Sequence, residues 1–275
     1  MNVIDGIESI EKVQFFSNIE ENDFTSLISE WKKTLTFPQD DMWASFIDQS
    51  NHLKILYKNM AIGYAAVNSK NQLLQFYIKP RWMNYGPAIL GQFIINQKIT
   101  KAILGTNNPL ALSCAMHHQK SISVHTYLFS HYNIHNYEVQ NSRKINVSTA
   151  NDLERLVNFY HQSTGGPKQW LNDYLSNLIN RSESYFIEEN KEIIGTCEVR
   201  LSDDNQAIAH IGMVVSPGHR QKGLGTFLLS KAKGRALQLN RKPICSCEKS
   251  NVGSLKAIHN NGFRSMYQML QIEFD

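Results

Sequence analysis

A short basic segment that contains three glycines carries the strongest chemical signal in this sequence. It reads Val214-Val215-Ser216-Pro217-Gly218-His219-Arg220-Gln221-Lys222-Gly223-Leu224-Gly225-Thr226 and joins a predicted strand to a predicted helix. The first amides of a helix lack intrahelical partners and lie at the positive end of its dipole, so they favour a bound anion. The glycines would let a phosphate approach the backbone, and two side chains, Arg220 and Lys222, add positive charge.

Two common phosphate-binding motifs do not match this segment. A Walker A loop requires Gly-Lys followed by Ser or Thr, and the segment lacks that sequence. A dinucleotide-binding fingerprint would need glycine where Leu228 stands, and no βαβ pattern surrounds it. The alternative is an ordinary strand-to-helix connection with incidental glycines, which Gly223 and Gly225 alone would favour.

The elements that must position this segment are predicted by the pattern of the second half of the chain. A capping signal (Ser148, Thr149 and Asp152) and Pro167 mark the starts of two helices. Strands are predicted at 184–188, 192–201, 207–215, 244–247 and 266–274, and two further helices at 225–239 and 251–260. Gly262 is a natural residue to end the last helix.

The first half repeats this order. Residues 58–80 match 191–217 in plan, since each has a strand through Ile-Gly, a polar turn and a strand that ends at proline. A helix through Phe93, a strand at 101–105 and a helix opening at 106–109 follow. The repeat predicts an α+β protein with two similar domains, 1–140 and 144–275, joined through the polar stretch 136–144. Chance similarity of common α/β patterns is the alternative.

Composition excludes several classes of protein. The chain has 275 residues and a formal net charge of +4, which is too little positive charge to predict binding to nucleic acid. It lacks an apolar run of membrane-spanning length and a signal-peptide pattern, so we expect a cytoplasmic protein that does not bind membranes. The four cysteines fit buried, reduced thiols, and His131 and His135 lack an acidic partner, so we expect no metal.

The whole arrangement resembles the GNAT (Gcn5-related N-acetyltransferase) superfamily over residues 144–275. The family signature, Arg/Gln-x-x-Gly-x-Gly/Ala after a strand, is met by Arg220, Gly223 and Gly225. An Asn-led helix closed by Gly-Phe, the second conserved block, is met by Asn251 and Gly262-Phe263. The resemblance implies two GNAT-like domains, each a mixed, mostly antiparallel sheet flanked by helices. The first would be a degenerate copy, because residues 81–86 lack the later signature positions.

The resemblance also implies acetyl transfer from acetyl-CoA to a primary amine of a small molecule or peptide. Pantetheine would pair with a strand that family members splay, the pyrophosphate would lie on the loop amides, and the helix after the next strand would approach the thiol. The residues implied are Met213, Val214 and Val215; Arg220, Gln221, Lys222, Gly223, Leu224, Gly225 and Thr226; and Asn251 and Ser254. Lys231 and Arg235 would either reach the 3′-phosphate or form a solvated basic face.

The acid–base residues depart from the family pattern. Family members often carry a glutamate on the splayed strand, which here offers Ala209 and His210, and a tyrosine on the last helix, where Ile258 stands. The candidates for the base are Glu198 and His210, with an exposed strand residue and a core histidine as the respective alternatives. Tyr267 is a candidate proton donor, although packing would equally explain it.

Two rival functions follow from these departures. The missing acid–base residues would fit a non-catalytic acyl-CoA-binding or regulatory module. Aminoacyl transfer from charged tRNA would need a strongly basic track, which a net charge of +4 does not favour. The acceptor, the acyl chain length and the oligomeric state are not determined by the sequence.

Overall fold

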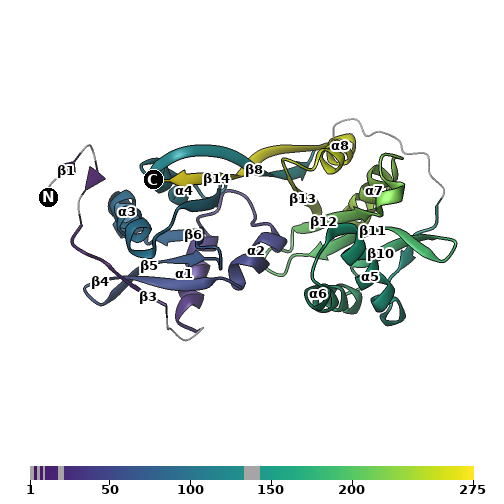
Figure 1. Cartoon of the computed structure of the whole chain (residues 1–275), viewed down its shortest axis with the longest axis horizontal. Coiled ribbons are helices and arrows are strands. Elements are labelled where there is room, and N and C mark those ends of the chain that lie inside the picture. Colours follow the sequence, from purple (N-terminus) through teal and green to yellow (C-terminus); the bar gives the residue numbers. More distant parts are fainter. Residues whose placement is uncertain (1–2, 5–6, 9, 18–21, 133–142) are drawn as a thin grey trace. The chain divides into compact units, whose positions relative to one another are not determined.

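The structure is a computed structural model that describes residues 3–4, 7–8, 10–17, 22–132 and 143–275 (Figure 1). It divides into two compact units. Unit 1 comprises Met1–Tyr127 with Tyr267–Asp275, and unit 2 comprises Leu128–Met266. The domain boundary predicted at 136–144 lies almost wholly within 133–142, outside the described residues.

Unit 1 is built on a mixed sheet with the strand order β3-β4-β5-β6-β7-β14. All neighbouring pairs are antiparallel except β6 and β7. Its strands are β3 (Gln14–Phe16), β4 (Asn51–Tyr57), β5 (Met60–Val67), β6 (Gln72–Ile78) and β7 (Lys101–Gly105), with a separate pair, β1 (Val3–Ile4) and β2 (Ile7–Glu8). Its helices are α1 (Asn22–Lys32), α2 (Asp41–Asp48), the 3₁₀ helix η1 (Pro80–Tyr85), α3 (Gly86–Gln97) and α4 (Pro109–Met116).

Unit 2 repeats this plan, with the strand order β9-β10-β11-β12-β13 and a single parallel pair, β12 and β13. Its strands are β9 (Asn146–Val147), β10 (Ser184–Glu189), β11 (Glu192–Leu201), β12 (Ile208–Val215) and β13 (Lys242–Glu248). Its helices are η2 (Ala150–Asp152), α5 (Leu153–Thr164), α6 (Lys168–Asn180), η3 (Pro217–His219), α7 (Leu224–Gln238) and α8 (Val252–Asn260). The predicted fold class, two α+β domains with mixed, mostly antiparallel sheets, is confirmed.

Two strands, β8 (Gln119–His131) and β14 (Phe263–Phe274), pass from one unit into the other. Residues 128–131 of β8 belong to unit 2, and residues 267–274 of β14 belong to unit 1, where they pair with β7. The predicted domain 144–275 differs from unit 2, because residues 267–275 belong to unit 1. Hydrophobic periodicity predicts a strand but does not identify the strand with which it pairs.

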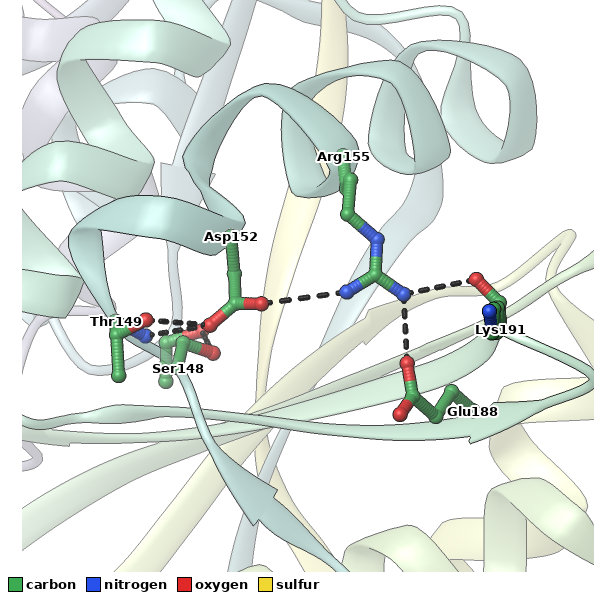
Figure 2. Close-up of polar contacts among 7 residues, drawn as sticks. Ser148, Thr149, Asp152, Arg155, Glu188 and Lys191 are labelled. Carbon is green, nitrogen blue, oxygen red and sulfur yellow. Dashed lines mark hydrogen bonds and ion pairs between the residues drawn. The ribbon is translucent and has the colours of Figure 1, made fainter.

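The start of α5 shows how local sequence positions an element (Figure 2). The Asp152 carboxylate accepts hydrogen bonds from the Thr149 amide at 3.0 Å and hydroxyl at 2.7 Å, which forms the predicted cap at η2, the 3₁₀ turn that leads into α5. The Arg155 guanidinium donates to Glu188 at 2.6 Å and to the Lys191 carbonyl at 2.9 Å. The first turn of α5 is thereby fixed to the turn between β10 and β11.

Glycine at position 195 is explained by helix packing. A Cβ built at Gly195 would lie 2.7 Å from Leu228 of α7, so the helix packs directly on the strand there. The matching Gly63 faces a different neighbour, since its Cβ would lie 2.1 Å from the Tyr77 carbonyl oxygen. Both units therefore have glycine at this position. In unit 2 it allows a helix side chain to approach the strand, and in unit 1 it allows the backbone of the neighbouring strand to do so.

Most of the predicted elements are confirmed, with ends within a few residues. Among the longer elements, the prediction did not identify α1, α2, β4 or β8. All four cysteines are buried and free, as expected. Among the described residues, no three His, Cys, Asp or Glu side chains are grouped to hold a metal ion, and no helix is long and apolar enough to cross a membrane.

Candidate active site

The strands β12 and β13 part midway along their length. Within these two fully described strands, the parallel pairing covers Ile208 with Lys242, Ala209 with Pro243 and His210 with Ile244, and then ends. Both strands continue beyond this point, and β12 stays paired with β11 up to Val215. The edge of β12 over residues 211–215 therefore faces a gap in the ladder, where backbone groups are available to an extended ligand.

The parting strand leads directly to the start of α7. Gly223 is the N-cap residue at φ +78°, and among the described side chains none caps the helix. The amides of the first turn are therefore left for an anion. A Cβ built at Gly218 or Gly223 would meet no atom within 4 Å, so both glycines border open space. A Cβ built at Gly225 would lie 3.5 Å from the Met213 side chain.

Arg220 and Lys222, the two cations of this loop, donate hydrogen bonds to backbone carbonyls. The Arg220 guanidinium donates to the Val215 carbonyl at 3.2 Å and to the Ser163 carbonyl at 2.8 Å. Lys222 donates to the Gly218 carbonyl at 2.9 Å. Arg220 thus holds the end of the strand and the end of α5, and both cations still contribute positive potential to the loop.

Asn251 and Ser254 lie together at the start of α8, after β13. The Asn251 side chain accepts a hydrogen bond from the Ser254 amide at 3.1 Å and so caps the helix. The buried Cys247 thiol contacts the Asn251 carbonyl oxygen at 3.6 Å. Burial raises the pKa of the Cys247 thiol to about 11, which keeps it protonated at neutral pH.

Glu198 is the centre of a buried polar cluster on the sheet face that α6 covers. Its side chain is 9% exposed and accepts a hydrogen bond from the Tyr174 hydroxyl at 2.7 Å. Arg200 forms an ion pair with the Glu198 carboxylate and donates to Tyr174 at 2.8 Å. Glu198 pairs across the ladder with Gly212, and a Cβ at Gly212 would lie 2.5 Å from the carboxylate. Glycine therefore leaves room for this carboxylate beside the splayed strand.

The tyrosines around Glu198 are held neutral. Burial, together with the Glu198 charge, raises the pKa of Tyr174 and of Tyr160 well above its ordinary value. Tyr160 of α5 accepts a hydrogen bond from Thr196, which lies on the same face of β11 as Glu198. The two hydroxyls are therefore hydrogen-bonding groups at neutral pH and not anions.

The other acid–base candidates lie elsewhere. His210 is 1% exposed, within the part of β12 that is paired on both sides. Tyr267 belongs to unit 1, where its ring stacks on Phe37 with centroids 4.9 Å apart. Ile258 is buried in α8, and exposed positions on α7 carry Lys231 and Arg235.

Comparison with known proteins agrees with this geometry. A family model described as the acetyltransferase (GNAT) domain matches residues 20–132, and one described as the acetyltransferase (GNAT) family matches residues 147–263. The chain belongs to the GNAT superfamily, as two domains in tandem. This tandem GNAT protein is therefore an acyltransferase, of a family that uses acyl-CoA donors. No curated protein matches its sequence significantly.

Solved structures share the fold of this tandem GNAT protein. An acetyltransferase of the GNAT family from Colwellia psychrerythraea is 24% identical with a TM-score of 0.87, over 96% of this chain and 100% of that chain. A GCN5-related N-acetyltransferase from Sphaerobacter thermophilus is 13% identical with a TM-score of 0.64, over 95% of each chain. A tandem GNAT protein from the clavulanic acid biosynthesis pathway is 13% identical with a TM-score of 0.62, over 95% of this chain and 98% of that chain.

The sequence analysis of this tandem GNAT protein missed the partners of Glu198. Arg200 carried a detectable signal, because residues two apart on a strand share a face. Tyr174 carried none, since it stands in the apolar stripe of α6 and only packing brings its hydroxyl to the carboxylate. A Cβ built at Gly225 would lie 3.5 Å from the Met213 side chain and 3.7 Å from the Val215 side chain, so the splayed strand borders the start of α7.

Proposed function

We propose that unit 2 binds acetyl-CoA and transfers its acetyl group to a primary amine of a small molecule or peptide. The observation that carries the proposal is the parting of β12 from β13 after His210, directly before an uncapped helix start. These two features offer an extended ligand a strand edge and then a phosphate site, in the order in which pantetheine and pyrophosphate occur in coenzyme A.

The cofactor would be held mainly by backbone groups. Met213, Val214 and Val215 would pair with the pantetheine arm, and the amides of residues 221–226 would hold the pyrophosphate. The open space at Gly218 and Gly223 fits a ligand that approaches the backbone closely. Asn251 and Ser254 would lie near the thiol end. Arg220, tied to two carbonyls, would hold the loop in shape.

Glu198 is the proposed general base. The neutral amine attacks the thioester carbonyl, the new C–N bond forms, the C–S bond breaks and the proton lost by nitrogen passes to Glu198, directly or through water. Coenzyme A leaves as a thiolate and takes a proton. Arg200 and Tyr174 would hold the Glu198 carboxylate in place beside Gly212. His210, almost wholly buried, is the second candidate.

A thermal melt with and without saturating acetyl-CoA tests the cofactor half of this proposal. At about a hundredfold excess over Kd, binding adds about 2.7 kcal/mol to the stability of the folded state. For a chain of this size each kcal/mol raises Tm by roughly 2–4 °C. A rise of several degrees is expected, followed by release of free CoA thiol when an acceptor amine is added. No rise at millimolar acetyl-CoA would exclude the proposal.

A non-catalytic acyl-CoA-binding module is the second candidate, and one observation favours it. The Glu198 carboxylate is already engaged by Arg200 and Tyr174, as in a purely structural polar cluster. This alternative predicts a clear melt shift with acetyl-CoA but no thiol release with any member of a broad amine panel.

A further inference from the structure

Arg220 joins two segments that the sequence separates widely. Its guanidinium binds the Val215 carbonyl at the end of β12 and the Ser163 carbonyl in the last turn of α5. The last carbonyls of a helix lack intrahelical partners and lie at the negative end of its dipole, so an arginine there is favourable. One side chain therefore ties the loop before α7 to the end of α5.

The two ends of α5 are anchored differently. The first turn is fixed by the Thr149–Asp152 cap and by the bonds of Arg155 to the hairpin between β10 and β11 (Figure 2). At the other end, the long-range hydrogen bond to the helix backbone comes from Arg220. Loss of Arg220 should therefore loosen the last turn of α5 and leave the first turn intact.

The segment beyond Ser163 leads to α6, the helix that carries a hydrogen-bond partner of the proposed base. Gly165 ends α5 at φ +77°, its amide bonds the His161 carbonyl, and the His161 ring contacts the Gly166 carbonyl at 2.8 Å. After this turn, α6 carries Trp170 stacked on Tyr174, which reaches Glu198. The turn at 164–167 thus connects the helix that Arg220 holds to the helix that meets the base.

We propose that Arg220 is a positioning residue that transmits occupancy of the acyl-CoA loop to the turn between α5 and α6. The inference rests on the proposed binding of acetyl-CoA to residues 221–226. A bound pyrophosphate would fix the backbone that carries Arg220, and the guanidinium would then hold Ser163 and the following turn more firmly. The first substrate would in this way order one wall of the site for the second.

Hydrogen–deuterium exchange with acetyl-CoA as the probe tests this link. In the wild-type protein, acetyl-CoA should slow exchange both at residues 221–226 and at the amides of Gly165 and Gly166. In Arg220→Gln, protection should be confined to the loop. The expected change at the turn is about fivefold in exchange rate, the factor that one net hydrogen bond is worth. Arg220→Lys should restore part of it.

A matched control is Arg264→Gln, because Arg264 also donates to backbone carbonyls, at His259 in the last turn of α8 and at Phe263 at the start of β14. Both carbonyls lie outside residues 163–167 and 221–226. This variant should leave unchanged the protection that acetyl-CoA gives to the amides of Gly165 and Gly166. Without ligand, Arg220→Gln should speed exchange at Gly165 and Gly166 and not in the first turn of α5. This readout holds even where the variant binds acetyl-CoA weakly.

The outcomes are distinguishable. Equal protection of the turn in wild type and Arg220→Gln would overturn the inference, as would acetyl-CoA binding that protects only the loop in the wild-type protein. Absence of any melt shift with acetyl-CoA in the wild-type protein would instead overturn the proposed function, and the inference with it.

Discussion

The two units share one sheet design but differ in the side chains at the cross-strand pair where unit 2 carries the proposed base. In unit 2, Glu198 of β11 pairs with Gly212 of β12, so a carboxylate extends over a glycine. In unit 1 the register places Ala66 opposite Gln75, whose amide donates to the Tyr64 hydroxyl. Gln75 is 2% exposed and Tyr64 is fully buried. Unit 1 thus fills with packed side chains the space where unit 2 keeps a carboxylate.

The loops that follow β6 in unit 1 and β12 in unit 2 also differ, since the first is packed with side chains and the second is open. In unit 1, β6 and β7 pair only at Gln72 with Lys101 and at Leu73 with Ala102, so the parting of the parallel strands is present in both units. The loop that follows carries Trp82 and Tyr85, which pack against the core of the unit. In unit 2 the same loop carries glycines that border open space. The sheet geometry alone therefore does not make a cofactor site.

The asparagine caps give a further lesson. Asn108 accepts a hydrogen bond from the Ala111 amide in unit 1, as Asn251 accepts one from Ser254 in unit 2. Because the unit without the glycine loop has the same cap, the cap is sufficiently explained by helix formation. Asn251 is thus weaker evidence for cofactor binding than Gly223 is.

The largest expected effect comes from removing residues 267–275, which would take the β14 strand from unit 1. This segment pairs with β7 and buries Met269, Ile272 and Phe274, worth together about 5–9 kcal/mol. Unit 1 should lose its cooperative unfolding transition. Removal of the exposed Asp275 alone should have little effect, and an unchanged urea unfolding curve of the longer truncation would contradict the prediction.

The next effect is on catalysis. Glu198→Gln removes the proposed base and should lower kcat by about 10²–10⁴, measured as CoA thiol release with an acceptor amine. The melt shift with acetyl-CoA should be retained, because the loop is untouched. Tyr174→Phe, which loses one hydrogen bond to the carboxylate, should lower activity less. Full activity of Glu198→Gln would contradict the role of Glu198 as the base. The difference from Ala66 at the matching position of unit 1 would then have no catalytic meaning.

The loop comparison is sharpened by a pair of glycine substitutions. Gly223→Val places a branched side chain at φ +78° and in the space open to the ligand, so acetyl-CoA affinity should fall by at least about tenfold. Gly86→Ala in unit 1 should lower stability, because its Cβ would lie 2.6 Å from the Cys114 sulfur, but should preserve affinity. Calorimetric titration of both variants checks the pair.

The most gradual effect is a loss of stability at alkaline pH that both units share. Burial raises the pKa of Cys114 in unit 1 and of Cys197 in unit 2 to about 12. The unfolded chain releases each thiol proton near pH 9, whereas the folded protein keeps it up to about pH 12. The stabilisation that each buried thiol gives to the folded state is therefore complete below pH 9 and is lost as pH rises to about 12. Each Cys→Ala variant should reduce the slope of unfolding free energy against pH by up to about 1.4 kcal/mol per pH unit. An unchanged slope would contradict the prediction.

The sequence by itself determined the local elements and the family. Apolar periodicity, the Thr149–Asp152 cap and the glycine that ends α8 are short-range features, and the corresponding helices and strands form where they were predicted. The signature of Arg220, Gly223 and Gly225 also lies within one segment, so it was readable without a structure.

Only the tertiary structure decided which residues meet. It assigns residues 267–275 to unit 1, ties Arg220 to Ser163 and brings Tyr174 of α6 to Glu198 of β11. It also distinguishes the cations of α7, since Lys231 is exposed while Lys233 is buried and its pKa is lowered by desolvation. Hydrogen bonds and burial between distant segments depend on how elements pack in space, and sequence periodicity records only which face of each element is apolar.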